Sequence, residues 1–143
     1  MVSPTLMPLR ILLVDGDAAT PEVIAIYLES RGHSVNACEG GQEALDVLDD
    51  HAFDLIISDV QMAGMNGFEL LRAVRKRVPD VGFILMTAYE DKYPLSEALE
   101  AGADGYISKP FSLSKFSLIF EQEYWTALSR QDWWEKHSVE EPA

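Results

Sequence analysis

The chain has 143 residues, of which 48% are hydrophobic and 24% are charged, a balance typical of one globular domain with a packed core. The 24 acidic and 11 basic residues give a net charge of -13, which repels phosphate backbones and argues against nucleic-acid binding. The single cysteine, Cys38, cannot form an internal disulfide, and no N-terminal apolar run is long enough to span a bilayer. We therefore expect a cytoplasmic protein that binds neither nucleic acid nor membrane and buries Cys38 as a reduced thiol.

Short apolar runs predict strands buried on both faces of a parallel sheet, at residues 10–14, 34–37, 53–57, 82–86 and 105–108. Segments with helical spacing lie between them, marked by Val23, Ile26, Tyr27 and Ser30, by Ala44, Leu45 and Leu48, by Phe68, Leu71, Ala73 and Val74, and by Leu95, Ala98 and Leu99. This alternation predicts an α/β fold, a doubly wound five-stranded parallel sheet with strand order 2-1-3-4-5.

Residues that end helices follow three of these segments. They are Gly32, Pro79 and Gly102, and Pro94 falls near the first turn of the fourth predicted helix. The last predicted helix runs from about Ser112 to His137. Its core stripe would comprise Leu113, Phe116, Phe120, Tyr124 and Leu128.

Polar residues stand where the predicted strands end, and ligands of such sheets gather at the carboxyl ends of the strands. These ends read Asp15-Gly16-Asp17, Ser58-Asp59, Thr87-Ala88 and Lys109-Pro110. Converging carboxylates repel one another and need a cation. Because the ligands would be oxygens, with no His or Cys among them, the expected cation is Mg²⁺.

A carboxylate beside Mg²⁺, a hydroxyl and a lysine form a site for phosphoryl transfer through an aspartyl-phosphate. On this interpretation Asp59 attacks phosphorus, while Asp15 and, as a further candidate, Asp17 hold the metal. Thr87 and Lys109 would each stabilise one phosphoryl oxygen. Taken singly, an aspartate after a strand is more often a helix cap, and a strand-end threonine more often bonds to backbone. Their joint placement at four strand ends favours the functional interpretation.

Three segments carry a resemblance to a known family. They are residues 55–67, around Asp59; Thr87-Ala88; and residues 101–111, which end in Lys109-Pro110-Phe111. They resemble the receiver domain of two-component response regulators, a flavodoxin-like fold of the single-domain CheY-like kind. The resemblance covers residues 9–128, which leaves residues 1–8 as an N-terminal tail and residues 129–143 as a helical extension and tail.

The resemblance implies a phosphoacceptor switch rather than an enzyme, with at most slow self-dephosphorylation. The phosphoryl donor would be a sensor histidine kinase or a phosphotransfer protein, and Mg²⁺ would be required. The backbone carbonyl of Gln61 would be a metal ligand, and Tyr106 would be the rotating aromatic of the last strand. Phosphorylation would draw Thr87 inward, and Tyr106 would follow.

Two positions depart from the family pattern. Receivers typically carry two adjacent acidic residues after the first strand, whereas Gly16 follows Asp15 here, so that Asp17 is the nearest substitute. The loop after the phosphoacceptor usually reads Met-Pro, but here it reads Met62-Ala63. We expect weak Mg²⁺ binding and a slightly looser loop.

Two alternatives stay open at this point. The first is a degenerate receiver that acts as an interaction module without phosphate, because Gly16 weakens the metal site. The second is a phosphatase resembling the haloacid dehalogenases, in which Asp15 would be the nucleophile and Asp17 the acid/base partner.

Two further expectations concern geometry and association. The Lys109-Pro110 bond is predicted to be cis, so that Lys109 points into the acidic crevice. Leu118, Ile119 and Trp125 give the last helix a second apolar side, and Trp133-Trp134 follow it. We expect this helix to mediate a homodimer or to dock an output partner.

Overall fold

The computed structural model describes residues 7–16, 19–89 and 91–129. Strands and helices alternate along them. The strands are β1 (Arg10–Val14), β2 (Ser34–Cys38), β3 (Leu55–Asp59), β4 (Gly82–Thr87) and β5 (Gly105–Ser108). The helices are α1 (Ala19–Ser30), α2 (Gly41–Asp50), α3 (Gly67–Arg77), α4 (Leu95–Glu100) and α5 (Leu113–Ser129). The strands pair in parallel in the order β2-β1-β3-β4-β5, which confirms the predicted topology.

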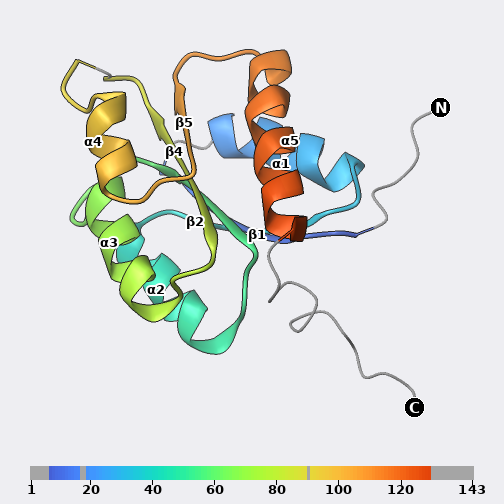
Figure 1. Ribbon diagram of the computed structural model, residues 1–143, viewed down its shortest axis with the longest axis horizontal. Helices are drawn as coiled ribbons and strands as arrows, with labels where there is room; N and C mark the ends of the chain where they lie inside the picture. The colour runs from blue at the N-terminus through green and yellow to red at the C-terminus, as the bar shows by residue number, and fades with distance from the viewer. Residues whose placement is uncertain (1–6, 17–18, 90, 130–143) are drawn as a thin grey trace.

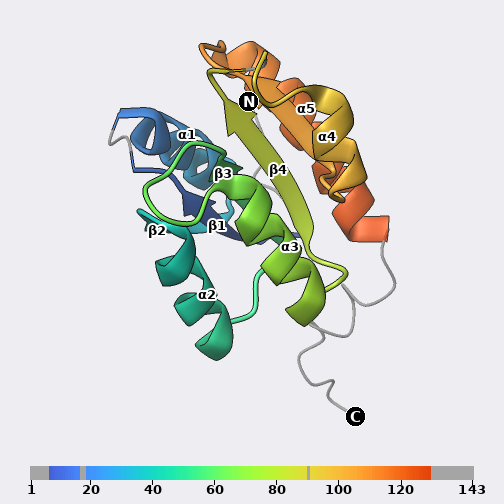
Figure 2. The same cartoon turned by 90° about the vertical axis from the view of Figure 1, so that its left-hand side faces the viewer.

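Helices cover both faces of the sheet, α1 and α5 on one face and α2, α3 and α4 on the other (Figure 1). The strand side chains alternate between these two layers. Leu12, Ile56 and Phe83 belong to the core under α2 and α3, whereas Ile11 and Leu13 belong to the core under α1 and α5. Figure 2 shows α2 and α3 side by side on their face. The central strands are therefore buried on both sides, as the continuous apolar runs predicted.

The predicted helix ends are confirmed. Gly32 and Gly102 each have φ 98° just after α1 and α4, the left-handed backbone that glycine adopts without strain. Val78 caps α3 immediately before Pro79, and Pro94 is the N-cap of α4. Cys38 is buried as expected, and burial raises the pKa of its thiol to about 12.

The apolar spacing of two helices gave the wrong buried face. In α1, Val23 and Ile26 are exposed, and Ile24 and Leu28 form the core contact instead. In α4, Ala98 is buried, but the flanking Leu95 and Leu99 are 50% and 57% exposed. The six residues of α4 make fewer than two turns, so this helix buries one small side chain rather than a stripe.

The C-terminal helix follows the prediction in part. Phe116, Phe120 and Tyr124 are buried against α1 and the sheet, with Leu128 at the margin. Leu113 is 42% exposed and does not belong to this stripe, because it stands at the first position of α5. Of the second apolar side, Leu118 and Trp125 are exposed, whereas Ile119 is partly buried against the core. Trp133-Trp134 and the extension to His137 lie outside the described residues.

None of the helices that the structure describes is both long and apolar enough to cross a membrane.

Candidate functional site

The strand register sets the predicted site residues side by side. Val14 pairs with Ser58, so Asp15 and Asp59 are the next residues along β1 and β3. Thr87 pairs with Ser108, so Lys109 follows β5 directly beside the end of β4. The Lys109-Pro110 bond is cis, as predicted.

The Lys109 ammonium bridges two carboxylates. Its Nζ lies 3.1 Å from Oδ2 of Asp15 and 3.3 Å from Oδ2 of Asp59. The Asp15 side chain is fully buried, while that of Asp59 keeps 11% of its surface exposed. Of these two acids, Asp59 is therefore the one that a reactant in solution can approach.

Burial and the facing charges set the protonation of this cluster. Burial and the nearby Asp15 raise the pKa of the Asp59 carboxyl above its ordinary value, although Lys109 and the backbone N–H of Gln61 oppose the rise. Burial works against the charge on Lys109. The hydrogen bond from its ammonium to Asp15 and the attraction of both carboxylates nevertheless hold the Lys109 pKa above its usual range. Lys109 is therefore a permanent cation against Asp59.

Thr87 lies fully buried at the end of β4, where its Oγ1 accepts a hydrogen bond of 2.9 Å from the N–H of Tyr89. The hydroxyl thus makes the backbone bond expected of a strand-end threonine, at the position predicted for the switch residue.

Tyr106 is tied to the loop before α4. Its hydroxyl donates to the carbonyl of Tyr93, and the Tyr93 ring stacks on Phe68 of α3 with the centroids 5.6 Å apart. The sequence singled out Tyr106, whereas Tyr93 carries no local motif and Phe68 was expected only as a residue of the third helix. A chain of contacts therefore joins β5, through the β4–α4 loop, to the first turn of α3.

The loop after Asp59 is closed by Gly67. A Cβ at this position would lie 2.6 Å from the Asp59 carbonyl oxygen and 2.8 Å from Cα of Val60. Asn66 then caps α3 by accepting from the Glu69 N–H, and the Glu69 side chain accepts from the Asn66 N–H in return. The glycine lets this helix start directly against the backbone of Asp59. In the sequence, this helix start is marked by the pair Asn66-Gly67 before an apolar stretch.

The site offers some, but not all, of the oxygen ligands that a hard divalent cation needs. Asp15 and Asp59 supply two carboxylates, and the Gln61 backbone adjoins Asp59. Among residues 7–16, 19–89 and 91–129, no three His, Cys, Asp or Glu side chains come together as a metal site. Asp17 lies outside these ranges. Two carboxylates with water and a phosphoryl oxygen suffice for Mg²⁺.

Gly16 leaves room for a longer side chain. The atom nearest to a Cβ built there is the Glu39 carbonyl oxygen, at an ordinary contact distance of 3.6 Å.

Comparisons with known proteins agree with this geometry. Residues 11–120 match the response regulator receiver domain family. The response regulator MprA of a Mycobacterium species is 37% identical over 109 residues, which are 76% of this chain and 47% of that protein. The response regulator protein FleR of Pseudomonas aeruginosa is 42% identical over 105 residues, 73% of this chain and 22% of that protein. The chain thus spans less than half the length of these curated relatives.

Solved structures show the same likeness. The chemotaxis response regulator CheY4 of Vibrio cholerae superposes with a TM-score of 0.74 at 28% identity, covering 80% of this chain and 98% of that one. The response regulator TrrA of Thermotoga maritima, solved in complex with Mg²⁺-BeF, gives a TM-score of 0.71 at 31% identity, covering 79% of this chain and 96% of that one.

Proposed function

Because the chain belongs to the family of response regulator receiver domains, we propose that it is a phosphoacceptor switch of a two-component system and that Asp59 receives the phosphoryl group. The observation that carries this proposal is the Lys109 ammonium held between Asp15 and Asp59 at the carboxyl ends of the strands. Within this arrangement Asp59 alone combines a neighbouring cation with access to solvent.

The proposed donor is a phosphohistidine of a sensor kinase or phosphotransfer protein in the cytoplasm. An Asp59 carboxylate oxygen attacks phosphorus and forms a P–O bond, while the P–N bond to histidine breaks and the nitrogen keeps its electron pair. Charge on the equatorial phosphoryl oxygens then faces Lys109, which needs no rearrangement because it already lies 3.3 Å from Asp59.

The expected metal is Mg²⁺, held by Asp15, Asp59 and the Gln61 carbonyl, with Asp17 as a further candidate. When bound, it would neutralise phosphoryl oxygens and the repulsion between the two carboxylates. The complex of the relative TrrA with Mg²⁺-BeF supports this assignment. The contribution of the chain is to bury Asp15 fully and so hold its carboxylate in one place.

The proposed output is a change in partner binding. A phosphoryl oxygen that accepts the Thr87 hydroxyl proton would draw Oγ1 towards Asp59 and away from the Tyr89 N–H that now donates to it. Movement of the loop that follows would disturb the Tyr93 carbonyl and release the Tyr106 hydroxyl. The face formed by α4, β5 and α5 would then change shape.

The two alternatives have less support. A haloacid-dehalogenase-type mechanism would use Asp15 as nucleophile, but the Asp15 side chain is fully buried and paired with Lys109. A degenerate receiver would have no need for a half-buried lysine placed between two carboxylates.

Beryllofluoride, a mimic of the phosphoryl group, tests the proposal. We expect a bound ¹⁹F NMR resonance in the presence of Mg²⁺ for the wild-type chain and for Asp80→Asn, an exposed acid that precedes β4 at the opposite edge of the sheet. Asp59→Asn should show no bound resonance. If Asp59→Asn binds as well as wild type does, the acceptor has been assigned wrongly.

Gly16→Asp is expected to tighten Mg²⁺ binding, because it adds a charged oxygen ligand where a Cβ fits without a clash. Calorimetric titration with Mg²⁺ measures the change, and Gly16→Asn serves as the matched control that adds an oxygen without charge. Equal affinity of wild type and Gly16→Asp would show that another group, such as Asp17, already supplies this ligand.

A further inference from the structure

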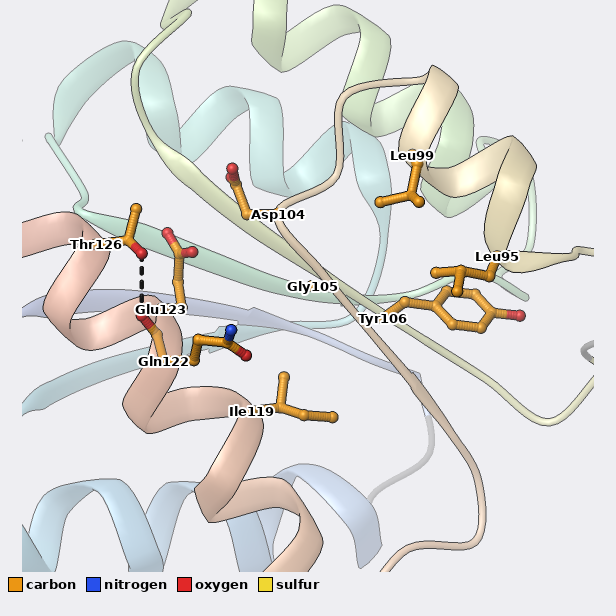
Figure 3. Close-up of a pocket in the computed structure, with 9 residues that line it drawn as sticks. All are labelled: Leu95, Leu99, Asp104, Gly105, Tyr106, Ile119, Gln122, Glu123 and Thr126. Carbon is orange, nitrogen blue, oxygen red and sulfur yellow. Dashed lines mark hydrogen bonds between the residues drawn. The ribbon is translucent and has the colours of Figure 1, made fainter.

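Some glycines of this chain stand where the backbone does not require one. Gly105 in β5 and Gly41, the first residue of α2, both lack a positive φ, although glycine weakens a strand or a helix relative to alanine. Close approach of another group explains such a glycine. At Gly105 this group is α5: Figure 3 shows Ile119 beside it in the groove between α4 and α5, and an added Cβ would lie 3.3 Å from the Ile119 side chain.

At Gly41 the approaching group is Met65 of the β3–α3 loop, residues 60–66. A Cβ at Gly41 would lie 2.8 Å from the Met65 Sδ and 3.0 Å from its Cβ and Cγ. Carbon atoms pack best at about 3.5–4.0 Å, so the Met65 side chain would have to leave this place. Gly41 is buried, and Met65 packs against the core under α2 and α3. Met65 is therefore seated on the bare backbone of α2.

Met65 is also one of the few points at which the β3–α3 loop is attached. Of residues 61–65, Met62 and Met65 pack against the core, whereas Gln61, Ala63 and Gly64 are exposed. Gly64 has φ 76°, and no proline ring restricts the backbone at Ala63. The backbone after Gln61 therefore has little stiffness of its own, and its position depends on where the two methionines pack.

The turn that leads into α2 also contacts the end of β1. There the Asp15 N–H donates a hydrogen bond of 3.0 Å to the Cys38 carbonyl. Residues 38–41 therefore join the two segments that we propose to hold Mg²⁺: they contact Asp15 through Cys38 and the β3–α3 loop through Gly41. A displacement of the loop from Gly41 would move one of these segments relative to the other.

We propose that the packing of Met65 on Gly41 positions the Gln61 carbonyl relative to Asp15, so that Gly41 and Met65 are positioning residues for the metal and the phosphoryl group. The inference rests on the proposed function for the role of Gln61, whereas the contact itself does not depend on it. Mg²⁺ requires a near-ideal octahedral arrangement of its ligands, so a small shift of one carbonyl weakens its binding.

The test compares Gly41→Ala with Gly40→Ala in the full chain. Gly40 precedes Gly41 directly, and a Cβ built there meets no atom within 4 Å, so this control adds the same methyl group in open space. NMR gives the amide chemical shifts of residues 61–65, and titration with Mg²⁺ gives the dissociation constant. Urea unfolding checks that every variant folds.

We expect Gly41→Ala to shift the amide resonances of residues 61–65 and to weaken Mg²⁺ binding about tenfold, a typical cost of disturbing a group that orients a metal ligand. Gly40→Ala should change neither. In a Met65→Ala background, Gly41→Ala should weaken Mg²⁺ binding much less, because the Sδ and Cγ atoms that it would displace are then absent.

Unchanged amide resonances in Gly41→Ala would overturn the proposal, because Met65 would then adapt without moving the loop. Shifted resonances with the Mg²⁺ affinity of wild type would refute the positioning role. Equal effects of Gly41→Ala with and without Met65 would place the cause elsewhere in α2. A wild-type chain that binds no Mg²⁺ would refute the proposed metal site together with this role, whereas failure of the inference alone leaves Mg²⁺ and beryllofluoride binding by wild type intact.

Discussion

Gly67→Ala is expected to lower the free energy of unfolding by about 3 kcal/mol and to displace the loop between Asp59 and α3. The added Cβ would lie 2.6 Å from the Asp59 carbonyl oxygen and 3.0 Å from the Leu85 side chain. Two of the three nearest atoms belong to the backbone of Asp59 and Val60, which cannot rotate away as a flexible side chain could. The helix start must therefore move off the strand end, and the Asp59 carboxylate moves with it.

Urea unfolding measures this loss, with Gly16→Ala as the matched control. Gly16 also adjoins a site aspartate, but its nearest neighbour would be 3.6 Å away, so this alanine should cost little. If the two substitutions destabilise the chain equally, the close approach of α3 to Asp59 does not constrain this loop.

Acidification from pH 6.5 to about 4 is expected to lower the free energy of unfolding by about 3 kcal/mol through His33 alone. Burial, assisted by Arg31 and opposed by Asp54, lowers the pKa of His33 from 6.5 to about 4. Its Nδ1 accepts the Leu9 N–H at 2.9 Å, and its ring packs edge-on against Phe120 and Tyr124. The folded chain therefore holds the neutral imidazole.

The sign follows from proton uptake. Below pH 6.5 the unfolded chain binds a proton at this histidine and the folded chain does not, so stability falls with pH until the folded pKa is reached. The measurement is urea unfolding of wild type and His33→Asn at several pH values, with exposed His51→Gln as the control. The difference between wild type and His33→Asn should narrow towards pH 4. If the free energies of unfolding of wild type and His33→Asn instead change in parallel with pH, the folded chain does not hold His33 in its neutral form.

Much of the architecture could be predicted because it depends on local patterns. Continuous apolar runs indicated central strands, and the alternation of strands and helices indicated a doubly wound sheet with the order 2-1-3-4-5. The same topology brought Asp15, Asp59, Thr87 and Lys109 to one edge, since parallel strands carry their carboxyl ends together.

What could not be predicted depends on packing between distant segments. The buried face of α1 shifted from Val23 and Ile26 to Ile24 and Leu28, because an apolar helix offers more than one stripe and packing on β1 and β2 decides which stripe is covered. His33 gave no signal in the sequence, since its burial comes from rings on α5 far along the chain.

The contacts of Tyr106 could not be predicted for a similar reason. The Tyr93 carbonyl that receives the Tyr106 hydroxyl belongs to a loop, and a backbone acceptor has no residue signature. The Tyr93 ring stacks on Phe68, and the spacing of apolar residues indicated Phe68 only as one more core residue of α3.

The most direct test of the central claim is the mass of the intact chain after incubation with acetyl phosphate and Mg²⁺. We expect wild type to gain about 80 Da, Asp15→Asn to gain the same mass more slowly, and Asp59→Asn to gain nothing. A gain that persists in Asp59→Asn but disappears in Asp15→Asn would contradict the account and make Asp15 the nucleophile.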